Sequence, residues 1–228
     1  MNILVIVDIH KSELGLRTTT DYIEEYKPDL LVIAGDITTF KPLEFTEKFI
    51  AGLPDIKILA LPGNCDPQDT LRILDESKAI NLHGRKEIID AITFVGLGGS
   101  NITPFNTPFE LTEDEIYSAL DNNMEPGAIL VLHFPVKGYL DEVPRGEHTG
   151  SEAALKIVEK YKPSLVISGH IHETRGIITD EFGIQHVNPG PLQNGYAAII
   201  DIEPNPRYEN DKQSMRYNCS IQLLPELL

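Results

Sequence analysis

The segment NILVIVDIH, residues 2–10, decides the fold, because an almost unbroken apolar run ends in two polar side chains. Residues 2–7 are apolar apart from Asn2, and they have the length of a strand covered on both faces of a parallel sheet. Asp8 and His10 follow directly, and a spacing of two places both side chains on the same side of an extended chain. Because ligands bind at the carboxyl ends of parallel strands, the segment predicts a binding site at one sheet edge.

Apolar runs of similar length alternate with helical segments through the first half of the chain. Strands are predicted at residues 30–34 and 56–60, and helices at residues 19–26, 43–51 and 67–76. A strand followed by a helix and then by another strand is typical of parallel strands joined by helical crossovers. The first half therefore predicts a parallel sheet.

The second half of the chain is richer in strands, which predicts a second sheet. Helices are expected after Thr112, where Glu115 completes a capping box, and at residues 151–161, where Ser151 is the cap. The expected strands are residues 87–89, 92–97, 128–132, 165–168, 175–179, 184–187, 196–202 and 219–224. The fold class is therefore α/β, with two sheets packed as a sandwich and flanked by helices.

We expect residues 1–228 to form a single domain. This length can bury a core without a disulfide or a structural metal ion. The chain has no repeat and no linker before residue 203, and the polar, irregular residues 203–216 predict a surface loop. The strand at residues 219–224 could pair within the chain or between chains, so a homo-oligomer stays open.

Composition argues against several classes of partner. The net charge of −16 repels polyanions, and no basic run offers a track for a long nucleic acid or an anionic membrane. No apolar run approaches the roughly 20 residues of a membrane span, and the apolar start lacks the basic flank and cleavage site of a signal peptide. Cys65 and Cys219 form no CxxC pair, so we expect no disulfide and a cytoplasmic location.

Polar side chains follow five of the predicted strands, at the point where each strand ends. They are Asp8, His10, Asp36, Asn64, His133, His170 and His172. Parallel strands bring their carboxyl ends to one edge, so these side chains are expected to meet. Carboxylate, amide and imidazole together suit Mn, Fe, Zn, Ni or Co. Seven ligands exceed the need of one ion and fit two divalent ions about 3.5–4 Å apart, bridged by a carboxylate.

The order D-x-H, G-D, G-N-x-D, H and G-H-x-H resembles the calcineurin-like metallophosphoesterase superfamily, and it covers the chain from Asp8 to His172. The resemblance implies a four-layer α/β/β/α sandwich of two mixed sheets flanked by helices. It also implies an enzyme that hydrolyses phosphoric esters with a metal-bridging hydroxide and two divalent metal ions, manganese foremost. The implied ligands are Asp8, His10, Asp36 and His172 for the first ion, and Asp36, Asn64, His133 and His170 for the second. Asn188-Pro189-Gly190 resembles a turn that many small members carry after their G-H-x-H segment.

Position 65 departs from the pattern of many phosphatases in this superfamily. They have G-N-H-[DE], in which the histidine protonates the leaving oxygen, whereas this chain has Cys65 followed by Asp66. A neutral thiol is a poor acid, and a hydroxide generated by metal ions leaves no need for a thiol nucleophile. A diester monoanion suits an acid-poor site better than a monoester dianion does. A small bacterial and archaeal branch that this sequence resembles has the same Gly-Asn-Cys-Asp and phosphodiesterase activity, so we expect a small phosphodiester as substrate.

A replacement acid is available in the loop that follows His133. His148 is the candidate for protonating the leaving group, and Arg145 is the candidate for contacting a phosphate, although an exposed loop without a catalytic role stays open. The predicted catalytic residues are Asp36, Asn64, His133 and His148. The alternatives are a phosphomonoesterase or phosphoprotein phosphatase at the same site, and a catalytically silent scaffold for protein interactions.

Overall fold

The first sheet is parallel at its centre and antiparallel at one side. The computed structural model describes residues 1–205 and 217–225, and this sheet has the strand order β14-β13-β1-β2-β3-β4. The strands are β1 (Asn2–Ile6), β2 (Leu30–Ala34), β3 (Lys57–Leu61), β4 (Ile80–Asn81), β13 (Ala197–Pro204) and β14 (Tyr217–Leu224). The helices α1 (Gly15–Tyr26), α2 (Glu44–Gly52) and α3 (Thr70–Glu76) connect the parallel strands β1 to β4.

The second sheet is also mixed and has the order β11-β12-β10-β9-β6-β5. Its strands are β5 (Arg85–Ile89), β6 (Ile92–Leu97), β9 (Ile129–Leu132), β10 (Leu165–Ile167), β11 (Gly176–Thr179) and β12 (Gln185–Asn188). Helices α4 (Glu113–Asp121) and α5 (Glu152–Tyr161) belong to this half. A short pair, β7 (Ser100–Asn101) and β8 (Glu110–Leu111), and the 3₁₀ turns η1 (His172–Thr174) and η2 (Leu192–Asn194) complete the elements.

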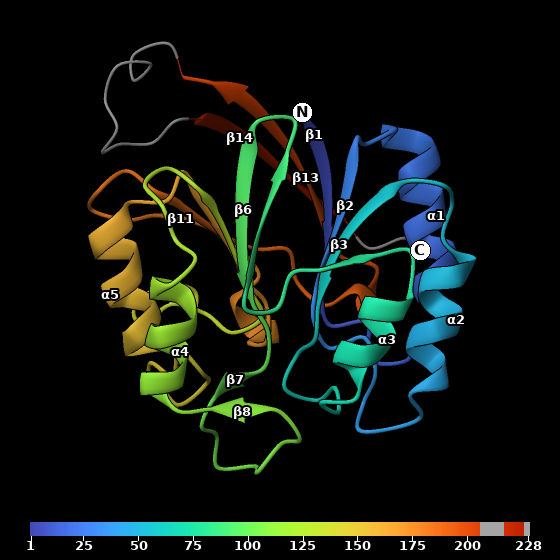
Figure 1. Ribbon diagram of the computed structural model, residues 1–228, viewed down its shortest axis with the longest axis horizontal. Coiled ribbons are helices and arrows are strands. Elements are labelled where there is room, and N and C mark those ends of the chain that lie inside the picture. Colours follow the sequence, from blue (N-terminus) through green and yellow to red (C-terminus); the bar gives the residue numbers. More distant parts are fainter. Residues whose placement is uncertain (206–216, 226–228) are drawn as a thin grey trace.

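The two sheets pack face to face between two layers of helices (Figure 1), with α1, α2 and α3 on one outer side and α4 and α5 on the other. Strand β1 shows how the sequence produces this arrangement. Ile3 and Val5 belong to the core between the sheets, whereas Leu4 and Ile6 belong to the core under α1 to α3. Because side chains alternate across a strand, a fully apolar strand is covered on both faces. The predicted four-layer α/β/β/α sandwich is confirmed.

Capping residues in the sequence correctly predicted where two of the helices begin. The Thr112 hydroxyl accepts the N–H of Glu115 at 3.3 Å and the Glu115 carboxylate accepts the N–H of Thr112 at 2.8 Å, which is the predicted capping box. Ser151 caps α5 as expected by accepting the N–H of Ala154 at 3.1 Å. By contrast, α1 begins at Gly15, four residues before the predicted start at residue 19. The residue preceding it, Leu14, makes no side-chain cap, so no capping residue in the sequence marks the start of α1.

The C-terminal strands pair within the chain. β14 pairs antiparallel with β13 along its whole length, and β13 continues to Pro204 into the segment predicted to be a loop. The remainder of that predicted loop, residues 206–216, lies outside the described residues. Across residues 1–205 and 217–225, no helix has the length and apolar character needed to cross a membrane.

Candidate metal centre

The loops that follow β1 and β2 are joined by hydrogen bonds between their backbones. Asp8 donates its N–H to the Gly35 carbonyl at 3.1 Å, and His10 donates its N–H to the Asp36 carbonyl at 2.9 Å. The N–H of His170, from the other sheet, donates to Asp8 Oδ2 at 3.1 Å. The strand ends of both sheets therefore meet, as the sequence predicted from the rule for parallel strands.

Four of the predicted ligands have a left-handed backbone conformation, which is uncommon for residues other than glycine. The φ angles are 54° at Asp8, 46° at His10, 51° at Asp36 and 69° at His170. Such a conformation costs on the order of 1–3 kcal/mol per residue and persists where the surrounding structure enforces it, often at functional sites. At these four residues the left-handed backbone sets the direction in which each side chain leaves the chain.

Asp8, His10 and His172 form the first group of ligand atoms. His10 Nε2 lies 3.3 Å from His172 Nε2, and Asp8 Oδ1 lies 3.8 and 3.6 Å from these two nitrogens. Ligand atoms that share one ion are separated by roughly 3–3.5 Å, because each metal bond is about 2.1 Å long. Asp8 Oδ1 is buried and has no hydrogen-bond partner within the described residues. An orphaned carboxylate oxygen beside two imidazole nitrogens fits a bound cation.

His133 and Asn64 belong to the second group. The Ala34 carbonyl accepts a hydrogen bond from His133 Nδ1 at 2.9 Å, and His133 Nε2 lies 3.0 Å from Asn64 Oδ1. The ring of His170 stands 5.2 Å from that of His133. Because a carbonyl only accepts, Nδ1 carries a proton and Nε2 is the nitrogen presented to a ligand.

Asp36 lies between the two groups. Its Oδ2 is 3.7 Å from His10 Nε2 and 3.4 Å from His133 Nε2, while its Oδ1 accepts the N–H of Cys65 at 2.8 Å. Burial opposes ionisation, yet the imidazoles of His133, His10 and His170 hold the pKa of Asp36 well below its usual range. One carboxylate oxygen is therefore positioned to be shared by two cations.

The imidazoles of the second group have shifted acidities with identifiable causes. Burial lowers the pKa of His133, but the Asp36 carboxylate outweighs it and raises that pKa to about 9. Burial and the neighbouring His133 lower the pKa of His170 to about 4. Because an imidazole must be neutral to bind a metal ion, a cation at His133 would displace a proton.

Two glycines allow the loops to approach closely. A Cβ at Gly63 would overlap the Asp36 carboxylate, and a Cβ at Gly169 would overlap the Val7 side chain and lie 3.0 Å from Asp8 Oδ2. Gly63 directly precedes Asn64 and Gly169 directly precedes His170, and only a residue without a Cβ permits so close an approach. Both glycines make room for the carboxylates that the site needs.

The comparisons with known proteins agree with this geometry. The profile of the calcineurin-like phosphoesterase family matches residues 1–174, which include every predicted ligand. The chain belongs to the calcineurin-like phosphoesterase family. The uncharacterized protein MJ1162 of Methanocaldococcus jannaschii is 39% identical over 202 residues, covering 84% of this chain and 88% of its own.

Solved structures share the fold of this phosphoesterase. TT1561 of Thermus thermophilus superimposes with a TM-score of 0.69 at 15% identity, covering 88% of this chain and 93% of its own. A novel archaeal phosphodiesterase gives a TM-score of 0.50 at 16% identity, covering 98% of this chain and 100% of its own. At these identities the structural similarity shows only that the fold is shared. It does not identify the substrate.

Cys65 and Asp66 have different roles next to the candidate metal centre of this phosphoesterase. The Cys65 sulfur, His10 and Asp36 have ligand atoms within 4.8 Å of one another. Burial and the charge of Asp36 raise the pKa of the Cys65 thiol well above its usual range, so it stays neutral. The Asp66 carboxylate instead accepts the N–H groups of Thr38 at 2.7 Å and Gly63 at 2.8 Å. Asp66 thus ties the two loops that carry Asp36 and Asn64, a role that sequence spacing did not reveal.

Asn188 braces the turn between His170 and His172. Its side-chain N–H donates to the Ile171 carbonyl at 2.9 Å, and its Oδ1 accepts the N–H of Gly190 at 2.9 Å. Asn188 is completely buried. The resemblance of residues 188–190 to a family turn pointed to this segment, but only the structure shows what the asparagine contacts.

His148 is held by a residue that the sequence analysis missed. Its Nδ1 lies 2.6 Å from Asp141 Oδ1, and its side chain is 49% exposed. Asp141 lies seven residues earlier in the same loop, and no recognised spacing signals the pair. Within residues 1–205 and 217–225, no hydrogen bond or ion pair joins His148 directly to a predicted ligand, and Arg145 is exposed, so their roles stay predictions.

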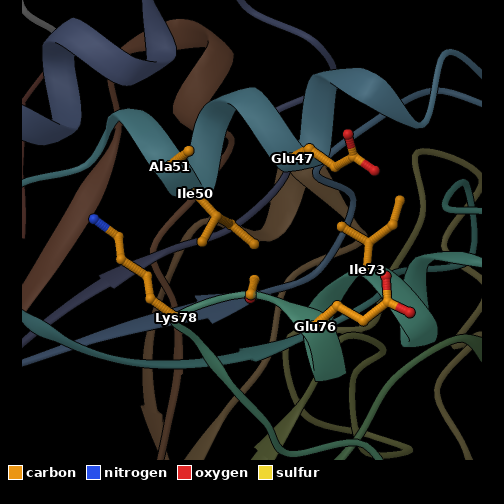
Figure 2. Close-up of a pocket in the computed structure, with 7 residues that line it drawn as sticks. Glu47, Ile50, Ala51, Ile73, Glu76 and Lys78 are labelled. Atoms are coloured by element: carbon orange, nitrogen blue, oxygen red, sulfur yellow. The ribbon is translucent and has the colours of Figure 1, made fainter.

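A hollow between α2 and α3 is separate from the metal centre (Figure 2). It is lined by Glu47, Ile50, Ala51, Ile73, Glu76, Ser77 and Lys78, and it includes none of the predicted ligands. The Lys78 ammonium already donates to the Leu53 carbonyl at 2.6 Å. The hollow therefore lacks the ligand set that phosphoester hydrolysis requires.

Proposed function

We propose that this phosphoesterase hydrolyses small phosphodiesters with two divalent metal ions, manganese foremost among Mn, Fe, Zn, Ni and Co. The observation that carries the proposal is the position of Asp36 Oδ2, between His10 Nε2 at 3.7 Å and His133 Nε2 at 3.4 Å. The first ion is assigned to Asp8, His10, Asp36 and His172, and the second to Asp36, Asn64, His133 and His170. This ligand set mixes the carboxylate, amide and imidazole donors that such ions accept.

The residues of the chain prepare the site for an anionic substrate. Bound divalent ions supply Lewis acidity toward the phosphoryl group and lower the pKa of a water molecule that attacks phosphorus. Asp8 and Asp36 are the charged members of the assigned set, while Asn64 is neutral, so two cations leave the site electropositive. The Cys65 N–H orients Asp36 and the Ala34 carbonyl orients His133, which holds the ligands in place before substrate binds.

The preference for diesters rests on position 65. The thiol of Cys65 is kept neutral by burial and by Asp36, so it is a poor proton donor to a leaving oxygen. A diester carries less negative charge than a monoester, and a proton that its leaving oxygen needs must come from a group other than Cys65. The net charge of −16 favours a small substrate over a polymer. The novel archaeal phosphodiesterase is an example of this reaction on the same fold.

A paired assay tests the proposal. Manganese-loaded protein is expected to hydrolyse bis(4-nitrophenyl) phosphate with a higher kcat/KM than 4-nitrophenyl phosphate. A clear preference for the monoester would favour the phosphomonoesterase or phosphoprotein phosphatase alternative. Metal content of the purified protein addresses the third alternative, since a silent scaffold has no need to retain two ions per chain.

A further inference from the structure

His148 and Asp141 form an oriented imidazole–carboxylate pair outside the assigned ligands. His148 Nδ1 lies 2.6 Å from Asp141 Oδ1, and a hydrogen bond to a carboxylate is stronger than one between neutral groups. Nδ1 is thereby committed to Asp141, which leaves Nε2 for a substrate. The His148 side chain is 49% exposed, whereas that of Asp141 is fully buried. The buried carboxylate therefore holds the ring while His148 Nε2 faces outward.

Asp141 is held firmly by its own loop. Its Oδ2 accepts the N–H of Gly138 at 3.0 Å and the N–H of Gly150 at 2.9 Å. The backbone N–H of Thr149 also donates to the Asp141 carbonyl at 3.0 Å. With these partners the carboxylate has little freedom, so it can determine the direction and the tautomer of His148.

Hydrogen bonds connect the loop that carries the pair to two other segments of the chain. In the first, Thr174 donates its hydroxyl to the Leu140 carbonyl at 2.6 Å, and Thr174 is in the same 3₁₀ turn as His172. In the second, Asn101 donates its side-chain N–H to the Thr149 carbonyl at 3.0 Å. Asn101 is in β7, which pairs with β8, and Phe109 just before β8 donates its N–H to the Asn64 carbonyl at 3.1 Å. These contacts link the loop, which begins after His133, to the segments that carry His172 and Asn64.

We propose that His148 is the general acid of this phosphoesterase and that Asp141 is the residue that positions it. The inference rests on the proposed function. As the oxygen of water forms its bond to phosphorus, the bond from phosphorus to the leaving oxygen breaks, and the leaving oxygen keeps the electron pair. That oxygen takes the proton from His148 Nε2, which leaves a neutral imidazole with its Nδ1–H on Asp141. The attacking water loses a proton to solvent and solvent returns one to His148, so atoms and charges balance over one turnover.

This assignment fills the role that Cys65 cannot serve. The Cys65 thiol is neutral and a weak hydrogen-bond donor, so an ester with a basic leaving group needs a proton from elsewhere. His148 supplies it from a loop that lies far in sequence from residue 65. The site would then accept diesters of ordinary alcohols and phenols, and not only those with acidic leaving groups.

A leaving-group comparison tests the acid. The substrates are 4-nitrophenyl phenyl phosphate and diphenyl phosphate, which differ in the acidity of the departing phenol. With manganese-loaded His148→Ala, we expect kcat/KM for diphenyl phosphate to fall roughly 10²- to 10⁴-fold, the usual contribution of a general acid. The nitrophenyl ester should lose far less, because its leaving group departs without a proton. His148→Gln keeps a donor for Asp141 but no transferable proton, so it should show the same selectivity, as should Asp141→Asn in weaker form.

Glu147→Ala is the matched control, because Glu147 is exposed and adjacent in the same loop. It should behave like the wild type on both esters. An equal loss on both esters in both His148 variants, no loss in either, or wild-type activity confined to the nitrophenyl ester would each overturn the assignment. Absence of any hydrolysis by the wild type would instead contradict the proposed function itself.

Nitrogen NMR of the metal-free protein provides a readout independent of turnover. Neutral His148 is expected in the Nδ1–H tautomer, because Asp141 accepts from Nδ1. Asp141→Asn should reduce the population of this tautomer. A neutral His148 protonated at Nε2 in the wild type would contradict the pairing on which the acid depends.

Discussion

Replacing Asn188 by alanine tests whether the turn that carries His170 and His172 depends on one buried amide. Asn188 donates to the Ile171 carbonyl at 2.9 Å and to Thr174 Oγ1 at 3.2 Å, and it accepts from the Gly190 N–H at 2.9 Å. Alanine removes all three hydrogen bonds and leaves the buried space unfilled. The Ile171 carbonyl keeps the Thr174 N–H at 3.1 Å as a partner, whereas the Gly190 N–H loses its acceptor, Asn188 Oδ1.

The expected cost follows from these contacts. A buried donor left without a partner costs roughly 1–3 kcal/mol, and the lost bond to a carbonyl that keeps another donor contributes about 1 kcal/mol. The free energy of unfolding should therefore fall by about 3 kcal/mol. For a chain of this size that corresponds to a decrease in Tm of roughly 6–12 °C. Because the amide holds the peptide between two assigned ligands, manganese affinity should fall about 10- to 100-fold.

Thermal unfolding of the metal-free protein and calorimetric titration with manganese measure both effects. Asn194→Ala is the matched control, because Asn194 is exposed in η2 and undergoes the same chemical change. Its stability should stay within about 0.5 kcal/mol of the wild type. Should Asn188→Ala match the wild type in both Tm and manganese affinity, the proposed bracing of the turn would be refuted.

Three further changes probe the centre and the core. Asp36→Asn should reduce the manganese content measured by mass spectrometry below two ions per chain and abolish diester hydrolysis, because the shared carboxylate loses its charge; two retained ions would contradict the bridging role. Cys65→Ala should keep the metal content and the diester activity of the wild type, because the neutral thiol is not assigned as a ligand, and a loss of metal would show otherwise. Burial and Arg85 lower the pKa of His83 to about 4, and Gly98 donates its N–H to His83 Nδ1 at 3.0 Å. The unfolded chain binds a proton at His83 below about pH 6.5, whereas the folded chain does so only near pH 4. The contribution of neutral His83 to the free energy of unfolding is therefore complete above about pH 6.5 and falls as the pH is lowered. Relative to His83→Asn in urea unfolding, the wild type should lose about 2–3 kcal/mol between pH 7.5 and pH 4.5, and a constant difference would disprove the effect.

The ligand candidates and the fold class were predictable because both depend on local sequence patterns combined with a topological rule. An apolar run that ends in Asp8 and His10 specifies a buried strand and the residues at its carboxyl end. Parallel strands then bring the ends of β1, β2 and β3 to one edge, whatever the details of packing. The capping box at Thr112 was predictable for the same reason, since its hydrogen bonds span three residues.

The tertiary structure alone decided which of these groups face one another. The position of Asp36 Oδ2 between His10 and His133 depends on left-handed backbone at Asp36 and on close approach at Gly63, which residue spacing does not encode. The pairing of His148 with Asp141 and the contact of Asn188 with Ile171 arise where loops meet after the sheets have packed. Such contacts depend on the path that each loop takes once the sheets have packed. Residues that are neighbours in the sequence therefore do not reveal them.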